Sequence, residues 1–464
     1  MSSSASAHPQ DLKRVAAELM TRADRLCRNA LDAGADQAEV YAVRSQSVGV
    51  GFEKGDLKLS QVDDGSTLGV RVFKGGKLGF ASTNQSSDAA LATAASDALT
   101  LCALNPPDEA NRLPETRPAA PDLNLVDPAI QELGIEEVVD HGQRFMDRAQ
   151  AHDARLSIDK ASVDLRIGTH CFVNSEGAEL SESDANLSAS IFGMAVDGDD
   201  VGGFHYTGDH VRNAERIDAA FAHCADEFAE VCIDNLKTGA AESYNGPVLF
   251  APDAVLELFV SPVISAVSAI AVQRGRSALK GKLGEAIAGA NFQLLDDPTD
   301  RLLAGAASFD REGQPIGAFP IVEDGVLKSY LYNSYAAAVE GKASTGHAVG
   351  GPRGLPGLGP HAVSMAGGSG GDRDALLGAL AKGLYVMRFS GTIDPASGDF
   401  SGVAKSARWV ENGRVVRSVR ETLISGNAFE LLRRFVAMST EAPTLNAAAR
   451  APWALVDGVS VTAG

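Results

Sequence analysis

The chain has 464 residues, of which 45% are hydrophobic and 22% are charged, as is typical of a globular protein with a buried core. This length predicts two or three domains that need neither disulfides nor metals to stay folded. The formal net charge of −19 disfavours direct binding to nucleic acid or to an anionic membrane, because both would meet an acidic surface.

Cysteine usage and the N-terminal sequence indicate the compartment. The five cysteines are scattered and form no C-x-x-C pair, which favours a reducing environment over a disulfide framework. The first residues contain no apolar segment typical of a secretory signal, and no stretch reaches the ~18 apolar residues of a membrane span. We therefore expect a cytoplasmic protein.

The first 104 residues are predicted to form an α+β module. Apolar residues recur at helical spacing from Asp11 to Ala33. The period then changes to two, which predicts short antiparallel strands between residues 38 and 81. An alanine-rich helix is expected over residues 87–104. Turns are predicted between the strands at Lys54-Gly55, Asp63-Asp64-Gly65 and Gly75-Gly76.

Residues 105–128 are rich in proline, which predicts a semi-extended linker. A second α+β module is expected over residues 129–240. Its predicted elements are a helix at 135–151, strands between 156 and 196, and a helix at 214–236.

Residues 244–464 are glycine-rich and show short strand patterns, which predicts a β-dominated C-terminal domain. We expect a strand at 247–251, a helix at 252–272 with a kink at Pro262, a helix from Asn427 to Met438 and a final strand at 455–461. The predicted fold class is α+β: helix-plus-antiparallel-sheet modules followed by this β-rich domain.

The histidines do not predict a metal site. No two of the nine stand four residues apart, as a helical zinc motif of the H-E-x-x-H type requires. His205 and His210 are five residues apart, which separates them by ~140° on an α-helix. Their surroundings favour a turn with solvated side chains, so we expect no metal ligands in this chain.

Two segments invite comparison with serine hydrolases. Gly367-Gly368-Ser369-Gly370-Gly371 matches G-x-S-x-G, but no apolar strand precedes it, so a surface loop is expected. Ser344-Thr345-Gly346-His347 places hydroxyls near an imidazole. This loop either carries a nucleophile or bonds its hydroxyls to its own backbone.

A series of short motifs in the C-terminal domain resembles the TldD/PmbA family, whose members were once called modulators of DNA gyrase. The N-terminal helix and the strands that follow it fit the same family. The motifs occur in this order: Gly275–Ser277 with Lys282–Glu285 (GRS, KLGE), Ser308–Gly313 (SFDREG), Val322–Leu331 (VEDGVLKSYL), Ser344–Ala348 (STGHA), Gly391–Asp394 with Ser397–Ser401 (GTID, SGDFS) and Thr422–Asn427 (TLISGN).

The resemblance implies a two-subunit metallopeptidase. In this family, TldD-type subunits bind zinc through a helical H-E-x-x-x-H motif and a later cysteine, whereas PmbA-type (TldE) subunits lack both. The corresponding helix here, Asp253 to Ala271, contains no histidine, and no cysteine follows Cys232. The chain therefore resembles the PmbA/TldE type. We expect no catalytic residue and no metal in this chain, zinc in a TldD-type partner, and peptides or unfolded proteins as substrates.

The loop from Ser344 to Gly359 is the predicted contact for substrate or partner. We assign this role to Ser344, Thr345, His347 and Arg353, because hydroxyl, imidazole and guanidinium groups can bond peptide carbonyls or a carboxylate. A purely structural loop is the alternative. Two other functions also stay open: a non-enzymatic regulator that binds proteins, and a zinc-independent hydrolase that uses the His347 loop.

Overall fold

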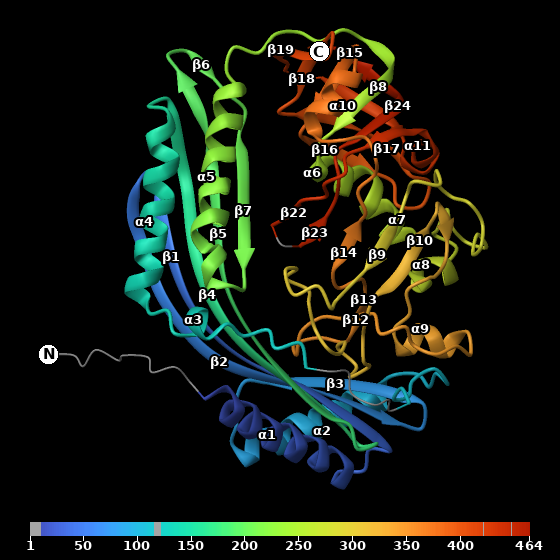
Figure 1. The fold of residues 1–464 in the computed structure, drawn as a ribbon. Coiled ribbons are helices and arrows are strands. Elements are labelled where there is room, and N and C mark those ends of the chain that lie inside the picture. Colours follow the sequence, from blue (N-terminus) through green and yellow to red (C-terminus); the bar gives the residue numbers. More distant parts are fainter. Residues whose placement is uncertain (1–10, 116–121, 421, 447) are drawn as a thin grey trace, which may run out of the picture.

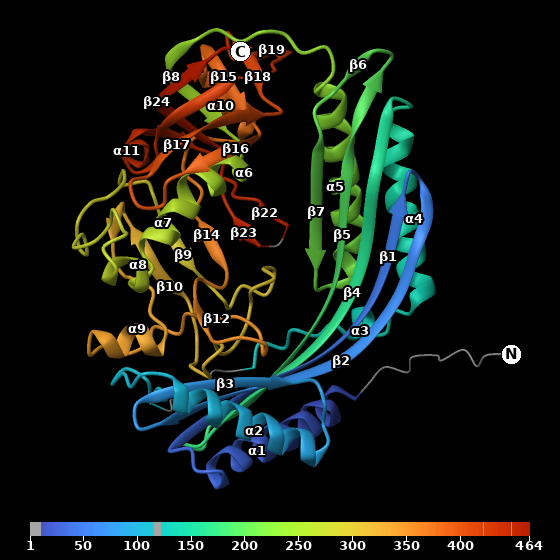
Figure 2. The same ribbon diagram turned by 180° about the vertical axis from the view of Figure 1, so that it is seen from behind.

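The computed structural model describes residues 11–115, 122–420, 422–446 and 448–464. A long antiparallel sheet from the N-terminal half curves around a β-rich C-terminal half (Figures 1 and 2). The predicted α+β class is therefore confirmed. Among the described helices, none combines the length and the apolar character that a membrane crossing would need.

The N-terminal sheet has seven strands in the order β3-β2-β1-β4-β5, with β6 and β7 both pairing with β5. β1 pairs with β4 from Glu39–Asn174 to Glu53–Lys160. Strands from the predicted modules 1–104 and 129–240 thus form one continuous sheet. The strands are β1 (Gln37–Glu53), β2 (Asp56–Lys74), β3 (Lys77–Thr83), β4 (Leu156–Asn174), β5 (Glu179–Asp197), β6 (Asp200–Val201) and β7 (His205–Val211).

Two predicted turns are wrong because sheet pairing overrides local turn propensity. β2 runs straight through Asp63-Asp64-Gly65, whose residues pair with Ser47, Gln46 and Ser45 of β1. The segment His205–His210 is strand β7, which pairs with β5 from His205–Gly193 to Val211–Leu187. His205 is buried rather than solvated, because it stacks on Phe228.

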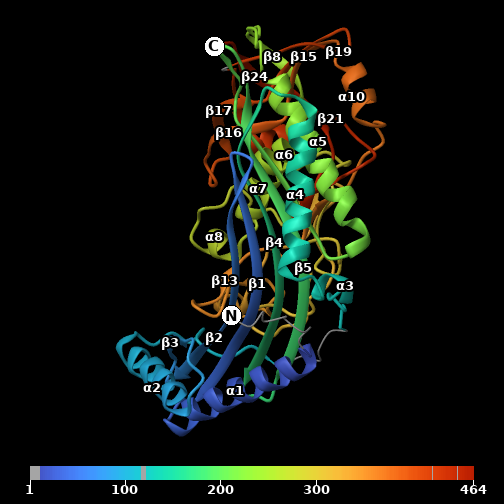
Figure 3. The same cartoon turned by 90° about the vertical axis from the view of Figure 1, so that its left-hand side faces the viewer.

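Helices cover only the outer face of this sheet. Figures 1 and 3 show α1 and α2 under its lower end and α4 and α5 along its upper part. The helices predicted at these four places are confirmed. Alternate residues of β4, such as Val163 and Leu165, pack toward the helices, while the intervening residues face the C-terminal half. The helices are α1 (Leu12–Asp32), α2 (Asp88–Leu104), α3 (Pro128–Gln131), α4 (Ile135–His152), η1 (Ala214–Arg216) and α5 (Ile217–Asp234).

The C-terminal half contains a nine-stranded sheet, a six-stranded sheet and the hairpin β12–β13. The nine-stranded sheet has the order β16-β17-β20-β24-β8-β15-β18-β19, with β21 beside β24. Its strands are β8 (Tyr244–Phe250), β15 (Lys382–Val386), β16 (Arg388–Ile393), β17 (Asp399–Lys405), β18 (Arg408–Glu411), β19 (Arg414–Ser418), β20 (Leu423–Asn427), β21 (Phe435–Met438) and β24 (Ala454–Thr462).

The six-stranded sheet has the order β11-β10-β9-β14-β23-β22. The strands of this sheet and of the hairpin are β9 (Leu294–Asp296), β10 (Phe319–Glu323), β11 (Val326–Leu327), β12 (Ala348–Val349), β13 (Gly357–Leu358), β14 (Val363–Met365), β22 (Thr444–Leu445) and β23 (Ala449–Arg450). The helices of this half are α6 (Pro252–Val255), the π-helical η2 (Leu256–Val260), α7 (Ser261–Ala266), α8 (Ala269–Gln273), α9 (Ser334–Val339), α10 (Arg373–Ala379), α11 (Ala428–Leu431) and η3 (Leu432–Arg434).

The predicted helix from Asn427 to Met438 is wrong beyond its first turns. α11 and η3 end at Arg434, and β21 then pairs with β24. The sheet supplies this segment with backbone partners and burial for Phe435 and Met438. The predicted helix 252–272 is divided: Pro262 is the second residue of α7, which follows the π-helical segment, and a break lies at residues 267–268. The predicted strands 247–251 and 455–461 correspond to β8 and β24.

Gly79 in β3 allows α2 to pack directly on the strand. A Cβ added there would lie 1.9 Å from the Ala98 carbonyl oxygen, which belongs to the backbone of α2. We expect Gly79→Ala to lower the free energy of unfolding by about 1–3 kcal/mol, because the helix must move away. Thermal unfolding followed by circular dichroism measures this loss. Gly65→Ala is the control, because no atom lies within 4 Å of the added Cβ; equal effects of both changes would contradict the interpretation.

Candidate functional site

The SFDREG motif, Ser308–Gly313, is the contact through which the C-terminal half packs on the N-terminal sheet. The Ser308 hydroxyl donates to Glu182 of β5 at 2.5 Å. The Phe309 ring lies 5.0 Å from the His170 ring of β4. The Arg311 guanidinium lies 4.3 Å from the centre of the Tyr41 ring of β1. A motif that identifies a family by sequence is therefore an interdomain contact in three dimensions.

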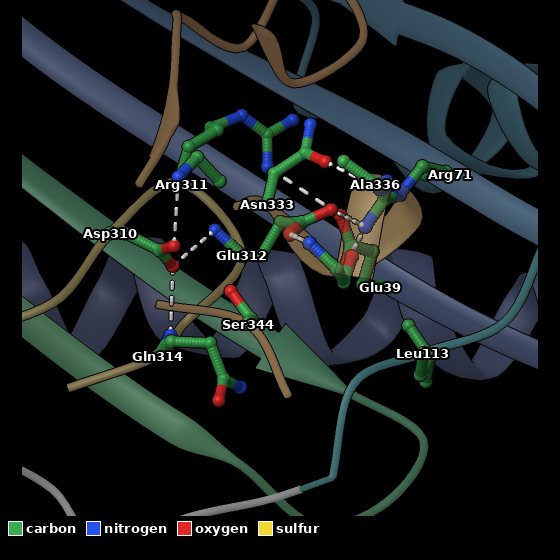
Figure 4. A network of polar contacts seen from close by, with 12 residues as sticks. Glu39, Arg71, Leu113, Asp310, Arg311, Glu312, Gln314, Asn333, Ala336 and Ser344 are labelled. Atoms are coloured by element: carbon green, nitrogen blue, oxygen red, sulfur yellow. Dashed lines mark hydrogen bonds and ion pairs between the residues drawn. The ribbon is translucent and has the colours of Figure 1, made fainter. Parts of the chain in front are cut away.

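A buried cluster of four charged side chains lies at the centre of this contact (Figure 4). Arg71 of β2 donates to both Glu39 and Glu312 at 2.9 Å. Arg311 approaches Glu39 at 3.6 Å. None of the four is more than 5% exposed. Two acids and two bases balance in charge, which makes their burial tolerable.

The electrostatics of the cluster differ between its two arginines. Burial alone would lower the pKa of Arg71, but Glu39 and Glu312 raise it above its ordinary value. Burial lowers the pKa of Arg311, and the neighbouring Arg71 adds to this effect while Glu39 opposes it. We conclude that Arg71 is the cation on which both carboxylates depend.

Asp310 and Gly313 determine the conformation of the Ser308–Gly313 loop, and neither forms an ion pair with the described strands of the sheet. Asp310 accepts hydrogen bonds from the backbone N–H groups of Glu312, Gln314 and Ala348 at 2.9–3.0 Å (Figure 4). Burial, together with the Glu312 charge, raises the pKa of Asp310. Gly313 has φ +72°, and a Cβ there would lie 2.4 Å from the Phe172 ring. Glycine thus allows the loop to approach β4.

Three of the four predicted contact residues lie together in the interior. The Ser344 hydroxyl donates to the Tyr332 carbonyl at 3.2 Å, and the Thr345 hydroxyl accepts from the Tyr332 N–H at 2.8 Å. Thr345 Oγ1 also lies 2.8 Å from Nδ1 of His347. Nε2 of His347 lies 3.2 Å from Oδ2 of Asp296. The hydroxyls bond the backbone of their own domain, as the structural alternative expects.

His347 is enclosed by its own domain. The imidazole is 2% exposed and packs edge-on against Phe319, with 4.7 Å between ring centres. Arg353 is not part of this buried group: it is exposed in the connection between β12 and β13. The neighbouring Pro352 carbonyl lies so close to Gly69 that a Cβ there would meet it at 2.2 Å. The hairpin therefore rests on β2.

The helix that resembles the family's zinc helix contains a π-turn. The N–H of Ser261 bonds the carbonyl of Leu256, a bond that spans five residues. In an α-helix such residues would be ~140° apart, whereas an i to i+5 bond brings them toward one side. If Glu257 takes the place of the glutamate in H-E-x-x-x-H, the two histidine positions are Leu256 and Ser261.

These residues do not fit a zinc ion, because neither leucine nor serine is a zinc ligand of the usual kind. In the described ranges, no three or more His, Cys, Asp or Glu side chains lie together in a way that could hold a metal. The backbone of this helix thus has a π-turn that brings positions 256 and 261 toward one side, but the side chains at these positions are not zinc ligands.

Carboxylates and one arginine surround this helix where it faces the N-terminal sheet. Glu257 accepts a hydrogen bond from the Phe389 N–H at 2.9 Å. The Arg388 guanidinium lies 4.1 Å from the ring centre of Tyr206 in β7. Burial raises the pKa of Asp253 to about 6; Glu227 and Glu257 add to the rise and Arg388 opposes it. The two halves therefore also meet at this helix.

Sequence reasoning missed the charged cluster, although the strands contain a hint of it. Glu39 stands between Ala38 and Val40, and Arg71 stands between Val70 and Val72. Such lone charges in apolar strands indicate a buried partner, because an unpaired buried charge is costly. The partner Glu312 is distant in sequence, so the pairing could not be predicted.

Comparisons with known proteins agree with this fold. A model of the PmbA/TldA metallopeptidase C-terminal domain matches residues 243–463, and a model of domain 1 of the same family matches residues 38–102. Together these matches cover more than half of the chain. The chain therefore belongs to the PmbA/TldD family of metallopeptidases.

Two relatives match nearly the full length. An uncharacterized protein of Methanocaldococcus jannaschii is 28% identical over 408 residues, which cover 87% of this chain and 91% of the relative. Metalloprotease PmbA of Escherichia coli O157:H7 is 27% identical over 418 residues, which cover 88% of each chain. The crystal structure of TldE from Thermococcus kodakarensis has the same fold, with a TM-score of 0.85, 22% identity and coverage of 95% of this chain and 100% of that one.

Removal of the central cation should destabilise the junction between the halves. We expect Arg71→Ala to lower the free energy of unfolding by about 3–5 kcal/mol, because Glu39 and Glu312 would stay buried without a partner. Chemical denaturation measures the loss. Lys58→Ala is the control on the same strand, since its exposed ion pair with Asp56 should contribute less than about 1 kcal/mol. Similar losses in both variants would show that the cluster is not a stabilising contact.

The raised pKa of Asp253 predicts a pH dependence with a defined sign. The pKa of Asp253 is about 6 in the folded chain, so the carboxyl keeps its proton up to about pH 6, whereas in the unfolded chain its pKa is the ordinary 3.8. The stability of the wild type relative to Asp253→Asn should therefore fall as pH rises from about 4 to above 6. Thermal midpoints of both proteins at several pH values measure this difference, with exposed Asp97→Asn as the control. A difference that does not change with pH would contradict the burial of this carboxyl group.

Proposed function

We propose that this chain is the zinc-free subunit of a two-subunit metallopeptidase, in which a TldD-type partner supplies the zinc and this chain completes the substrate cavity. The observation that carries the proposal is the helix of α6, η2 and α7. It keeps a π-turn but has Leu256 and Ser261 at the two positions where the motif would require histidines. No cysteine follows Cys232 to provide a later ligand.

The inner face of the N-terminal sheet supports a role in holding polypeptide. Two adjoining pockets of about 450 and 160 Å³ lie on it and share Gly51, Leu59 and Ser162. The lining includes the small residues Gly51, Ala161, Ser162 and Ser190 and the aromatic residues Phe192 and Tyr206. Small side chains let another backbone approach closely. A peptide or an unfolded protein segment is the substrate class that suits such a surface.

A free strand edge offers a second way to hold peptide backbone. Among the described strands, β2 pairs with β3 only from Leu68 to Lys74, so its outer edge from Asp56 to Thr67 has no strand partner. Extended peptides bind such edges through main-chain hydrogen bonds, with little dependence on sequence. This edge is therefore our candidate for strand addition by substrate or by partner.

Thr345, His347 and Asp296 lie in the hydroxyl, imidazole and carboxylate order of a hydrolase, but the burial of His347 and Asp296 argues against the zinc-independent hydrolase alternative. A nucleophile must reach the substrate, but His347 is buried and Thr345 bonds the backbone of Tyr332. Ser344 likewise donates to a carbonyl rather than to an imidazole. The remaining alternative is a regulator that binds proteins without taking part in cleavage. Whether the complex with a TldD-type partner cleaves peptides distinguishes this alternative from our proposal.

The proposal predicts activity only in the presence of the partner. We expect the chain and a TldD-type protein to co-elute as a stoichiometric complex, and only the mixture to cleave an unfolded protein such as casein. A chelator should abolish this cleavage, because the water-activating ion would be lost. Cleavage is measured by release of acid-soluble peptides.

The matched control is the same mixture with both motif histidines of the partner changed to alanine, which should form the complex but not cleave. Chelator-insensitive cleavage by the isolated chain would overturn the proposal. A stable complex that never cleaves would instead favour a binding regulator.

A further inference from the structure

A polar pocket of about 510 Å³ lies at the lower end of the C-terminal half, away from the helix with the π-turn. One wall is the end of the described linker, residues 112–115; the other comprises α9 and the segment that leads to Ser344. Figure 4 shows Leu113, Gln314 and Ser344 in this region. The volume lies within the range of small-ligand sites, roughly 300–1,000 Å³. The pocket adjoins the charged cluster but shares none of its four residues.

Two buried residues present unpaired polar atoms to this pocket. Gln314 is 3% exposed; its Nε2 donates to the Glu115 carbonyl at 3.3 Å, and its Oε1 has no protein partner in the described chain. Ser334 is 8% exposed; its N–H donates to Glu312, and its hydroxyl bonds no described residue. Both atoms are therefore available to form a hydrogen bond with a molecule that enters the pocket.

Two cationic side chains, Arg112 and Lys342, line the pocket, although the whole chain is acidic. Arg112 is exposed and forms no ion pair with any described residue. Lys342 bonds Glu340 at 2.7 Å and the Tyr332 hydroxyl at 2.8 Å. Glu115 is the one acidic residue among the lining residues. The unpaired guanidinium is therefore the group best able to bind an anion, and it prefers a planar carboxylate.

We propose that this pocket binds the C-terminal end of a peptide. Arg112 would pair with the terminal carboxylate, and Gln314 and Ser334 would bond the last peptide amide, because a carboxamide and a hydroxyl can each both donate and accept. Leu113 and Ala337 provide apolar wall for a side chain. The choice of a peptide rests on the proposed peptidase function; the anionic and amide chemistry rests on the pocket alone.

Binding of labelled peptides to the isolated chain tests this proposal. The probe is a fluorescent five-residue peptide of alanine and glycine with a free C-terminal carboxylate, and its C-terminal amide is the comparison. By fluorescence polarisation, we expect the acid to bind roughly ten-fold more tightly than the amide, because one charged hydrogen-bond partner is lost. Arg112→Gln should abolish the difference between acid and amide. Ser334→Ala should weaken both peptides by a few-fold.

Arg414→Gln is the matched control. It removes the same charge from an exposed residue of β19, which lies at the opposite end of the C-terminal half (Figure 1), and it should leave both affinities unchanged. Circular dichroism spectra check that each variant is folded. Equal affinity for acid and amide, or an Arg112→Gln variant that still prefers the acid, would overturn the proposal.

Competition distinguishes the two sources of the same carboxylate chemistry. A free amino acid or acetate that displaces the probe as well as an unlabelled peptide does would overturn the peptide assignment in favour of a small carboxylate. Failure here is distinguishable from failure of the proposed function, because this assay uses neither partner nor cleavage. Normal partner-dependent cleavage with no peptide binding to the isolated chain would refute the pocket and leave the subunit role intact.

Discussion

The arrangement of the whole molecule depends on the charge balance between Arg71, Glu39, Glu312 and Arg311. Four buried charges from two sheet strands and one loop are tolerated only in the position where each carboxylate meets a cation. Any displacement of the C-terminal half along the sheet would leave a charge buried without a partner. We therefore infer that the cluster specifies one docking position of the two halves.

This docking position brings the other features into place. The backbone that bears Glu312 continues to Gln314 in the polar pocket, and the Glu312 side chain accepts from the N–H of Ser334 in the same pocket. At the other end, the helix with the π-turn faces β7 across the contact of Arg388 with Tyr206. The inner face of the sheet lies between these two contacts, where a peptide could be held.

Local patterns predicted much of the fold, and long-range pairing limited the rest. The four long helices of the N-terminal half were predicted from apolar spacing or, for α2, from its alanine content. The turn at residues 63–65 and the helix to Met438 failed, because the strands that pair with these segments are remote in sequence. For His347, the sequence shows an imidazole beside hydroxyls but not Asp296 or Phe319, which bury it. The resemblance to the TldD/PmbA family predicted where zinc ligands would be expected in the sequence, but no local pattern predicted the π-turn in that helix.

We propose that this chain binds no zinc even within an active complex. Zinc-edge anomalous diffraction from crystals of the chain with a TldD-type partner tests this proposal most directly. We expect an anomalous peak on the partner's motif helix, with ligands at about 2.0–2.3 Å. We expect no peak beside Leu256 and Ser261. A zinc peak coordinated by residues of this chain would contradict the claim.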